Sequence, residues 1–356
     1  MRILVTGGAG FIGSNLIQRL LLNKENKVFN LDKMGYASST KSIDNLLKNI
    51  SSKSLGKYEF LKVDLENKLD TQNALDYAYP DLIMHLAAES HVDRSIDGPD
   101  SFIASNIIGT FNLLESSRKI WRKFDEKKKN TFKFHHISTD EVFGSLGKTG
   151  RFSEGTPYKP RSPYAASKAS SDHLVLSWHH TFGLPVVLTN CSNNYGPWQF
   201  PEKLIPLTIY KAYQNQSIPL YGDGENVRDW LFIDDHIDAL LLVAKKGVIG
   251  QSYCIGGRGE KSNKNVVLEI CKIMDKINPL NAPHKKLISY VPDRPGHDKR
   301  YSINPSKIKK ELGWKSKHTF REGLEKTVHW YVNNLEWYER TISSKQYNFE
   351  RLGNKL

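Results

Sequence analysis

Five side chains in the middle of this sequence have the types and spacing that acid–base chemistry needs. Asp140 and Glu141 are adjacent carboxylates that follow Thr139 at the end of a predicted strand, and such a pair can remove one proton and deliver another. Tyr164 and Lys168 are four residues apart in a helical stretch, so both project from one helix face. A nearby ammonium favours a phenolate, so we expect Lys168 to lower the pKa of Tyr164 and make it a base for an alcohol proton.

A tyrosine base combined with two carboxyl groups predicts an oxidation that prepares an elimination. A proton on an ordinary sugar carbon is not acidic, and hydroxide is a poor leaving group. Oxidation of the neighbouring carbinol to a ketone acidifies that proton, after which Glu141 and Asp140 can divide the roles of base and acid. Thr139 can hold the reacting hydroxyl against Tyr164. A simple alcohol dehydrogenase needs neither carboxylate, although the residues alone leave open that both acids only cap or bridge the loop.

The run TGGAGFIG near the N-terminus predicts a dinucleotide-binding loop between a strand and a helix. Gly7, Gly10 and Gly13 permit a tight turn, and the helix N-terminus offers free N–H groups to a pyrophosphate. Asp32, after the second predicted strand, is suited to accept hydrogen bonds from the adenosine ribose and to repel a 2′-phosphate. This favours NAD over NADP, although Lys33 beside it blurs the argument.

Short β-rich segments alternate with longer helical patterns through about residue 190, which predicts βαβ units and a parallel sheet. The ligands of such sheets lie beyond the carboxyl ends of the strands, where the motifs above fall. Asp64, at the end of the third strand, is placed to meet the adenine, with a helix N-cap ahead of Leu65 as the alternative. The predicted strands are residues 3–6, 27–30, 58–63, 82–86, 132–138 and 185–189, and helices are predicted over residues 11–22 and 102–119.

The sequence changes after residue 190 to shorter segments rich in Pro, Gly, Asn and aromatic residues. We therefore predict an α/β fold with a Rossmann-type doubly wound parallel sheet over residues 1–190 and a smaller, loop-rich C-terminal substrate lobe over residues 191–340. Helical stretches such as residues 234–246 are expected to pack back on the sheet. Residues 341–356 are expected to form a C-terminal tail.

The composition is that of an ordinary soluble enzyme, with 39% hydrophobic and 25% charged residues among 356. The net charge is +13, but the basic residues are dispersed, so we expect no nucleic-acid partner. Three cysteines stand far apart without a Cys-x-x-Cys spacing, which fits a reducing compartment. The first residues run directly into a strand and no apolar run approaches the ~20 residues that span a bilayer. A cytoplasmic protein without membrane contact is therefore expected.

Histidine and tryptophan clusters carry no functional prediction. The pairs His135–His136 and His179–His180 lack a third ligand, so we expect no metal site and place them on the surface of a strand and of a helix. Trp198, Trp230 and Trp314 are expected to pack in the core or in the second lobe rather than to stack on nucleic-acid bases.

The sequence motifs resemble those of the dTDP-glucose 4,6-dehydratases of the extended short-chain dehydrogenase/reductase family along nearly the whole chain. The Thr-Asp-Glu word is the part that is specific to dehydratases within that family. The resemblance implies an early step of deoxysugar biosynthesis in which bound NAD is reduced and reoxidised within each turnover. Tyr164 would take the C4 hydroxyl proton, Glu141 the C5 proton, and Asp140 would protonate the departing C6 hydroxyl. The matching words are residues 6–15, 85–95, 106–110, 138–144, 162–168, 189–197, 221–230 and 293–298.

The same resemblance implies two sets of ligand contacts and a mode of assembly. Arg228 and Arg294 suit the charge of a diphosphate. Phe143 stands where the family usually has tyrosine, which removes a hydroxyl but no catalytic group. A homodimer through a four-helix bundle is expected, with residues 102–119 and 165–182 as the candidate helices. The implied NAD contacts are Gly7, Gly10, Phe11, Ile12, Gly13, Asp32, Lys33, Asp64, Leu65, Leu86, Ala87, Ala88, Ser105, Tyr164, Lys168 and Asn194. The implied substrate contacts are Ser90, Thr139, Asn193, Glu202, Lys203, Pro219, Tyr221, Arg228, Asn263, Arg294 and His297.

Two other functions compete with this interpretation. The same chemistry on UDP-glucose or CDP-glucose is the nearest alternative, because a few groups in the second lobe read the base. A catalytically idle NAD-binding sensor is more remote, since it would have little use for Thr139, Asp140, Glu141, Tyr164 and Lys168 together.

Overall fold

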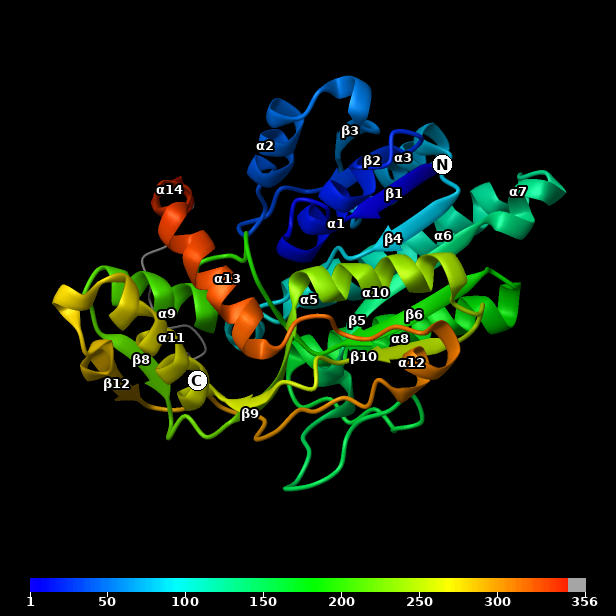
Figure 1. The fold of residues 1–356 in the computed structure, drawn as a ribbon. Helices are drawn as coiled ribbons and strands as arrows, with labels where there is room; N and C mark the ends of the chain where they lie inside the picture. The colour runs from blue at the N-terminus through cyan, green and yellow to red at the C-terminus, as the bar shows by residue number, and fades with distance from the viewer. Residues whose placement is uncertain (345–356) are drawn as a thin grey trace.

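The computed structural model describes residues 1–344, and its centre is a seven-stranded parallel sheet (Figure 1). The strand order is β10-β6-β5-β4-β1-β2-β3, so the direction of winding reverses between β1 and β4. A crevice for ligands forms where winding reverses in an open sheet. The strands are β1 (Arg2–Thr6), β2 (Lys27–Asp32), β3 (Lys57–Lys62), β4 (Leu82–His85), β5 (Lys133–Thr139), β6 (Val186–Cys191) and β10 (Ser252–Ile255).

Helices cover both faces of this sheet, as a doubly wound fold requires. One face carries α1 (Phe11–Leu21), α2 (Lys41–Asn49) and α10 (Ile233–Lys246), and the other carries α3 (Lys68–Ala78), α6 (Gly109–Arg122) and α8 (Pro163–Phe182). The predicted fold class is confirmed. Each of the six predicted strands is present, and its ends differ from the prediction by no more than two residues.

A second lobe of shorter elements lies beside the carboxyl ends of the strands, at the left of Figure 1. The strand β10 and the helix α10 come from beyond residue 190 yet belong to the large sheet and its cover. The boundary at residue 190 therefore stays a prediction about function rather than a break in the fold. The lobe contains β7 (Asn193–Tyr195), β9 (Val227–Phe232) and β11 (Glu260–Ser262) in one sheet, β8 (Ile218–Tyr221) and β12 (Ile288–Val291) in another, and α9 (Leu204–Tyr213), α11 (Asn263–Ile277), α13 (Phe320–Asn333) and α14 (Leu335–Ser344).

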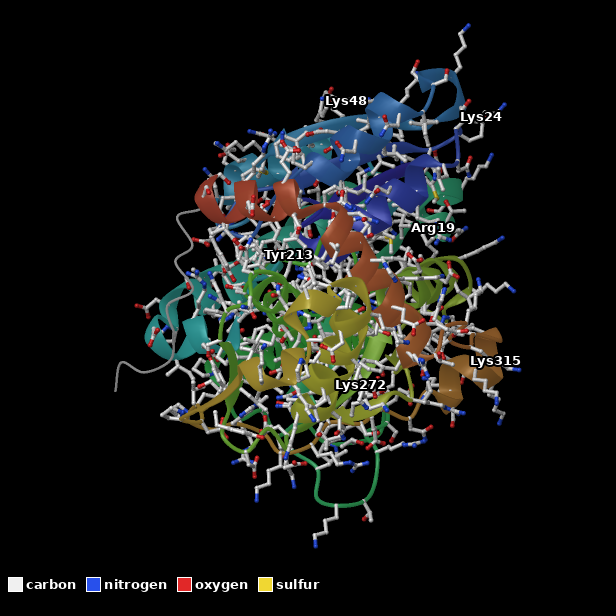
Figure 2. The ribbon with its side chains drawn as sticks, turned by 60° about the vertical axis from the view of Figure 1, so that its left-hand side comes forward. Arg19, Lys24, Lys48, Tyr213, Lys272 and Lys315 are labelled. Atoms are coloured by element: carbon white, nitrogen blue, oxygen red, sulfur yellow. The ribbon has the colours of Figure 1, made fainter. Side chains whose placement is uncertain are left out.

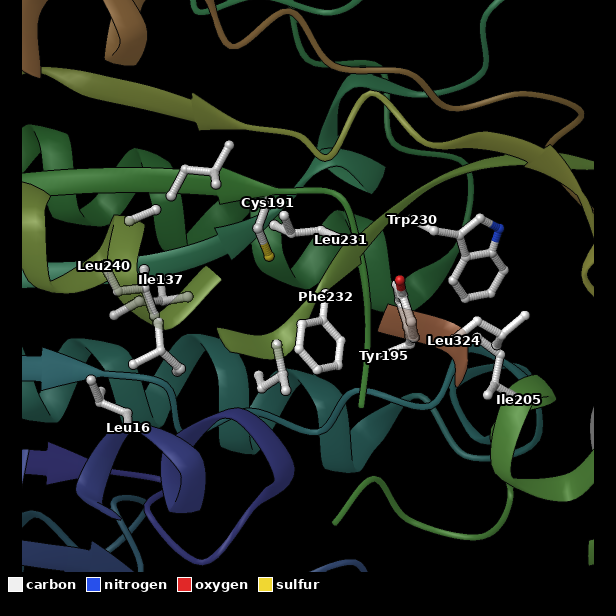
Figure 3. Packing of buried hydrophobic residues seen from close by; sticks show 14 of the residues in the cluster. Leu16, Ile137, Cys191, Tyr195, Ile205, Trp230, Leu231, Phe232, Leu240 and Leu324 are labelled. Atoms are coloured by element: carbon white, nitrogen blue, oxygen red, sulfur yellow. The ribbon is translucent and has the colours of Figure 1, made fainter. Parts of the chain in front are cut away.

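One apolar core joins the second lobe to the sheet. Figure 3 shows it running from Leu16 and Leu240, on the helices over the sheet, to Tyr195, Trp230 and Leu324 in the lobe. Burial of so much shared apolar surface favours one relative position of the two parts. The ligand cleft between them is therefore held by a common core.

The structure corrects two details of the sequence interpretation. The predicted helix over residues 102–119 is made of α5 (Asp100–Phe102), a π-helix η2 (Ile103–Ile108) and α6. His135 and His136 are fully buried, so their prediction as surface residues is wrong. They lie on β5, a central strand whose two faces are both covered, and they bond to Thr189 and Asp172.

Three further predictions concern the tryptophans, the basic residues and the C-terminal tail. Trp230 and Trp314 are buried, and Trp198 packs against Trp330 and Trp337, so the expected packing role of these tryptophans is confirmed. The basic residues labelled in Figure 2 lie apart on several elements. The first four residues of the expected tail, 341–344, continue α14, while 345–356 lie outside the described residues.

Candidate active site

One cleft at the carboxyl ends of β1 to β6 gathers every residue predicted to contact the cofactor. The glycine loop forms one wall, and the residues that follow β2, β3 and β4 form others. The ends of β5 and β6 complete the cleft and contribute Thr139, Glu141 and Asn194. Strand ends that neighbour one another in a parallel sheet bring these distant sequence words together.

The glycine loop leaves room only for backbone. A Cβ on Gly13 would lie 2.3 Å from the carbonyl oxygen of Gly7, and a Cβ on Gly7 would lie 2.6 Å from the backbone nitrogen of Ala87. Gly7 also has φ +70°, a conformation that glycine adopts without strain. No side chain caps the N-terminus of α1, so its first N–H groups face the cleft as donors for an anion. This cradle fits the pyrophosphate of NAD.

Asp32 ties the loop after β2 to the glycine loop. Its Oδ2 accepts a hydrogen bond from the backbone N–H of Ala9 at 3.0 Å, and its Oδ1 accepts from the Met34 backbone at 2.8 Å and the Ser38 hydroxyl at 2.9 Å. The carboxylate is thereby fixed at the edge of the cleft, where the adenosine ribose of a dinucleotide would lie.

Lys33 is held away from Asp32 by other carboxylates. Its Nζ lies 3.4 Å from both Glu66 and Glu89. Burial opposes the charge of the ammonium, but Glu89, Asp64 and Glu66 outweigh it and raise the pKa of Lys33. This ammonium is engaged by protein groups, which removes the ambiguity that Lys33 brought to the argument for NAD over NADP.

Asp64 lines the cleft and does not cap α3. Its Oδ1 accepts from the backbone N–H of Glu66 at 3.0 Å, whereas the cap of α3 is Asn67, which accepts from Leu69 and Asp70. The alternative of a helix N-cap at Asp64 is therefore excluded, and a place near the adenine remains its predicted role.

The two adjacent carboxyl groups begin a short 3₁₀ helix, η3 (Asp140–Phe143), directly after β5. Thr139 caps it by accepting from the Glu141 backbone at 3.2 Å. Burial, followed by the charges of Glu141 and Asp229, raises the pKa of Asp140 well above its ordinary value. The Oδ2 atom of Asp140 is buried and has no hydrogen-bond partner in the part of the chain that the structure describes. Burial without a partner therefore favours the protonated form of Asp140.

Glu141 lies in a different electrostatic setting. Burial raises its pKa, but the cations Arg294, Arg228 and Lys203 act against burial. Glu141 lines the cleft, whereas Asp140 does not and is only 1% exposed. Burial thus favours the protonated form of Asp140, while the cations around Glu141 favour its ionised form, which is the arrangement that an acid and a base need.

Tyr164 and Lys168 lie on α8, where both reach the cleft as predicted. The Nζ of Lys168 donates to the carbonyl of Ile137 at 3.1 Å, and burial lowers the pKa of this ammonium. The expectation of a lowered Tyr164 pKa is wrong for the protein alone. Burial and the charge of Glu141 raise it well above its ordinary value and outweigh the hydrogen bond from Thr139.

Comparison with known proteins shows the family of this chain. The model of a family described as GDP-mannose 4,6 dehydratase matches residues 4–327. A dTDP-glucose 4,6-dehydratase from Escherichia coli is 50% identical over 99% of each chain. The chain belongs to the dTDP-glucose 4,6-dehydratase family.

Solved structures of this dehydratase family have the same fold. The dTDP-glucose 4,6-dehydratase of Bacillus anthracis, in complex with NAD, is 43% identical, covers 96% of this chain and 99% of its own, and has a TM-score of 0.82. The dTDP-glucose 4,6-dehydratase of Streptomyces venezuelae, with NAD and TYD bound, is 39% identical, covers 96% of this chain and all of its own, and has a TM-score of 0.85.

The substrate residues that the dehydratase resemblance implied fall into two groups. Ser90, Thr139, Asn193, Glu202 and Lys203 line the same cleft as the cofactor residues. The others are not among its lining residues and belong to the second lobe: Pro219, Tyr221, Arg228, Asn263, Arg294 and His297.

The two arginines of the second group have protein partners at the border of the acid pair. Arg294 forms an ion pair with Asp93 at 2.9 Å, and Arg228 donates to the carbonyl of Asp298 at 3.0 Å. Both arginines act on the pKa of Glu141. Their charges therefore act on the acid pair, and contact with a diphosphate stays a prediction.

Several residues of this dehydratase site escaped the sequence analysis. The hydroxyl of Tyr36 donates to Glu202 at 2.9 Å, and the Arg94 guanidinium lies 3.8 Å from the centre of the Tyr36 ring. Burial raises the pKa of Glu202, which Tyr36 and Arg94 counteract. Asp93 also went unassigned. The signal was present, since Asp93 and Arg94 lie within a matched family word and Tyr36 follows Asp32 closely.

Two features are absent from residues 1–344. None of their helices is long and apolar enough to cross a membrane. The same residues contain no group of three or more His, Cys, Asp or Glu side chains that could hold a metal ion.

Proposed function

We propose that the protein dehydrates dTDP-glucose to dTDP-4-keto-6-deoxyglucose with a resident NAD. The names of its relatives support the substrate, and the NAD in their structures supports the cofactor. The glycine cradle and the fixed carboxylate of Asp32 fit a dinucleotide without a 2′-phosphate. The product would enter the synthesis of deoxysugars.

Thr139, Glu141 and Tyr164 in the cleft, and the buried Asp140 next to Glu141, divide the proposed steps. Tyr164 takes the proton of the C4 hydroxyl, which Thr139 holds in place. Glu141 takes the C5 proton, and Asp140 gives a proton to the departing C6 hydroxyl. NAD, when bound, would accept the C4 hydride and give it back at C6 while the proton held by Glu141 returns to C5, so no external oxidant is consumed.

The contrast between Asp140 and Glu141 is the observation that carries the proposal. Elimination of water at neutral pH needs one carboxyl group with its proton and one without. The buried, unpartnered oxygen of Asp140 suits the first role, and the cations around Glu141 suit the second. A dehydrogenase or an NAD-binding sensor has no use for this difference.

The base of the nucleotide is the part of the substrate that needs a direct test. The protein is mixed with dTDP-, UDP- and CDP-glucose, and products are followed by mass spectrometry for the loss of one water. We expect the greatest turnover with dTDP-glucose, and NAD(H) released from the protein on denaturation. A preference for UDP- or CDP-glucose would correct the base alone. Water loss from none of them, with NAD bound, would support the idle sensor.

We also propose that the protein is a homodimer through α6 and α8, which pack side by side on one face of the sheet. Ile103 and Ile108, on the π-helix that precedes α6, are each 46% exposed. Apolar side chains there suit burial against a second copy. Light scattering should give twice the chain mass of 40.6 kDa, and a mass of one chain would reject the dimer.

A cytoplasmic location is part of the same proposal. Cys191, Cys254 and Cys271 are all buried and free, which suits a reducing compartment. Fractionation of cells that produce the protein would test it, and recovery from an oxidising compartment would reject it.

A further inference from the structure

Asp172 is a buried carboxylate one helical turn beyond Lys168 on α8, and it was no part of the predicted site. It is 0% exposed. Charged side chains are almost never fully buried without partners that offset the loss of water. Four side chains bond to it: His136 Nε2 at 3.0 Å on Oδ1, and the Ser138 hydroxyl at 2.9 Å, the Tyr158 hydroxyl at 2.9 Å and the Asn190 amide at 3.2 Å on Oδ2.

These bonds connect Asp172 to the strand end that carries the chemistry. Ser138 directly precedes Thr139, and the amide of Asn190 also donates to the carbonyl of Thr139 at 3.2 Å. The carboxylate thus holds β5 and β6 in register beneath the residue that orients the reacting hydroxyl. A carboxylate serving only the packing of α8 would not need to bridge both strands at this point.

The charge of Asp172 also acts on Lys168. The titratable groups whose charges interact with this ammonium are His85 on β4, His136 on β5, Cys191 on β6 and Asp172 on its own helix, and Tyr164 lies one turn before it on that helix. Burial lowers the pKa of both histidines, well below its ordinary value for His85 and to about 4 for His136. Burial lowers the pKa of Lys168 as well, and Asp172 is the largest of the charges that oppose this effect.

We propose that Asp172 is a positioning residue for the oxidation step, which holds Lys168 as an ammonium beside Tyr164 and fixes the strand end that bears Thr139. The inference rests on the proposed function, because it concerns the C4 oxidation. Asp172 touches neither substrate nor cofactor and acts through Lys168 and Thr139.

Asp172→Asn removes the charge with little change of shape. The new amide can place its oxygen toward Ser138, Tyr158 and Asn190 and its NH₂ group toward His136. The neutral His136 ring can accept at Nε2 by carrying its proton on Nδ1, which has no partner among residues 1–344. Tyr158→Phe is the matched control, since it removes one hydrogen bond to the same carboxylate and leaves the charge.

The experiment isolates oxidation in a Glu141→Gln background, where the C5 proton stays in place. Formation of bound NADH after mixing with dTDP-glucose is followed in single turnovers as a function of pH. We expect Asp172→Asn to move the alkaline limb of this rate to lower pH by about one unit or more, because Lys168 loses the opposite charge. Tyr158→Phe should leave the limb in place even where it lowers the rate or the melting temperature.

The outcomes separate the two proposals. No NADH in the Glu141→Gln parent would count against the proposed function itself. NADH in the parent, with the same limb in Asp172→Asn, would overturn the role of Asp172. A limb moved equally by Tyr158→Phe would also overturn it, since a structural role would then suffice.

A second variant covers failure of Asp172→Asn to fold. Each single variant, Lys168→Met or Asp172→Asn, leaves one buried charge without its opposite charge. The double variant Lys168→Met/Asp172→Asn removes both charges, so it should recover folded protein, as measured by circular dichroism and thermal melting. Failure of the double variant to fold better than Asp172→Asn would reject the pairing.

Discussion

The cofactor half and the substrate half of the cleft are built from different materials. The cofactor half consists of backbone and short loops at the ends of neighbouring parallel strands, and all of its predicted residues converge. The substrate half draws on β8, β9, α11 and the loop after β12, and some of its polar residues have protein partners. Arg294 is paired with Asp93 and His297 with Asp293.

This difference shows which part of the site follows from the topology of the sheet and which part depends on contacts between side chains. A parallel sheet brings its strand ends together whatever the loops contain, so a dinucleotide site follows from topology. The second lobe has no comparable constraint, and its arginines are held by an ion pair at Arg294 and by hydrogen bonds to backbone carbonyls at Arg228. Glu141 lies where the halves meet. Its charge raises the pKa of Tyr164 in the cofactor half, and Arg228 and Arg294 of the substrate half lower the pKa of Glu141 itself.

The largest expected effect is at this junction. Glu141→Gln keeps the shape of the side chain but cannot take the C5 proton, so we expect turnover to fall on the order of 10²–10⁴-fold. Oxidation by Tyr164 should continue, so that bound NADH accumulates after mixing with dTDP-glucose and little deuterium enters C5. Stopped-flow absorbance and mass spectrometry measure the two effects.

Asp140→Asn is the matched variant, because it removes the acid and leaves the base. It should permit exchange at C5 and slow the departure of the C6 hydroxyl. Equal C5 exchange in Glu141→Gln and in the wild type would contradict the assignment of the base. The division of labour between the two carboxyl groups would then have to be reversed.

The next effect should be confined to the cofactor half. Gly13→Ala places a methyl group 2.3 Å from the Gly7 carbonyl, so the loop must shift and we expect NAD affinity to fall about 10–100-fold. Gly147→Ala is the control, since a Cβ there meets nothing within 4 Å. Equilibrium dialysis of stripped protein against NAD measures both variants. Unchanged NAD affinity in Gly13→Ala would show that the cradle is less rigid than its geometry indicates.

The same contrast explains how much was predictable from sequence. The glycine loop, the strands and the cleft residues after β1 to β5 follow from local pattern and from the rule that parallel strands share an edge. Burial of His135 and His136 did not follow, because single histidines give no periodic signal that both faces of β5 are covered. The roles of Asp172, Tyr36 and Asp93 depend on contacts between distant segments. The raised pKa of Tyr164 depends on burial, which the spacing of Tyr164 and Lys168 cannot reveal.

A smaller effect should be confined to the substrate half. Arg294→Met removes a charge-assisted partner for the diphosphate, so we expect KM for dTDP-glucose to rise about tenfold or more while NAD content is unchanged. Arg19→Met is the matched control, because Arg19 also pairs with an aspartate, Asp238 at 2.9 Å, but lies on α1 outside the second lobe. Steady-state kinetics with NAD-loaded enzyme gives the comparison. Loss of NAD from Arg294→Met would mean that the two halves are not independent.

The smallest effect concerns stability in acid. The buried histidines of the large sheet and its covering helices should lower the free energy of unfolding as the pH falls. His236 on α10 is fully buried, and burial lowers its pKa to about 3 from an ordinary value of 6.5. The unfolded chain therefore binds a proton that the folded chain does not, so this contribution to stability is complete above about pH 6.5 and is lost as pH falls toward 3. Each such histidine adds up to about 1.4 kcal/mol per pH unit to the slope of the unfolding free energy.

His236→Leu should flatten the slope of the unfolding free energy between pH 6 and 5 by about one proton, or up to about 1.4 kcal/mol per pH unit, as measured by urea unfolding at several pH values. His329→Leu, on the exposed side of α13 in the second lobe, controls for the change of residue type. Neither ring nitrogen of His236 has a hydrogen-bond partner among residues 1–344, so the substitution by leucine deprives no other group of a hydrogen bond. An unchanged slope in His236→Leu would mean that this histidine gains its proton in the folded protein. The packing around α10 would then admit water in acid more readily than its burial implies.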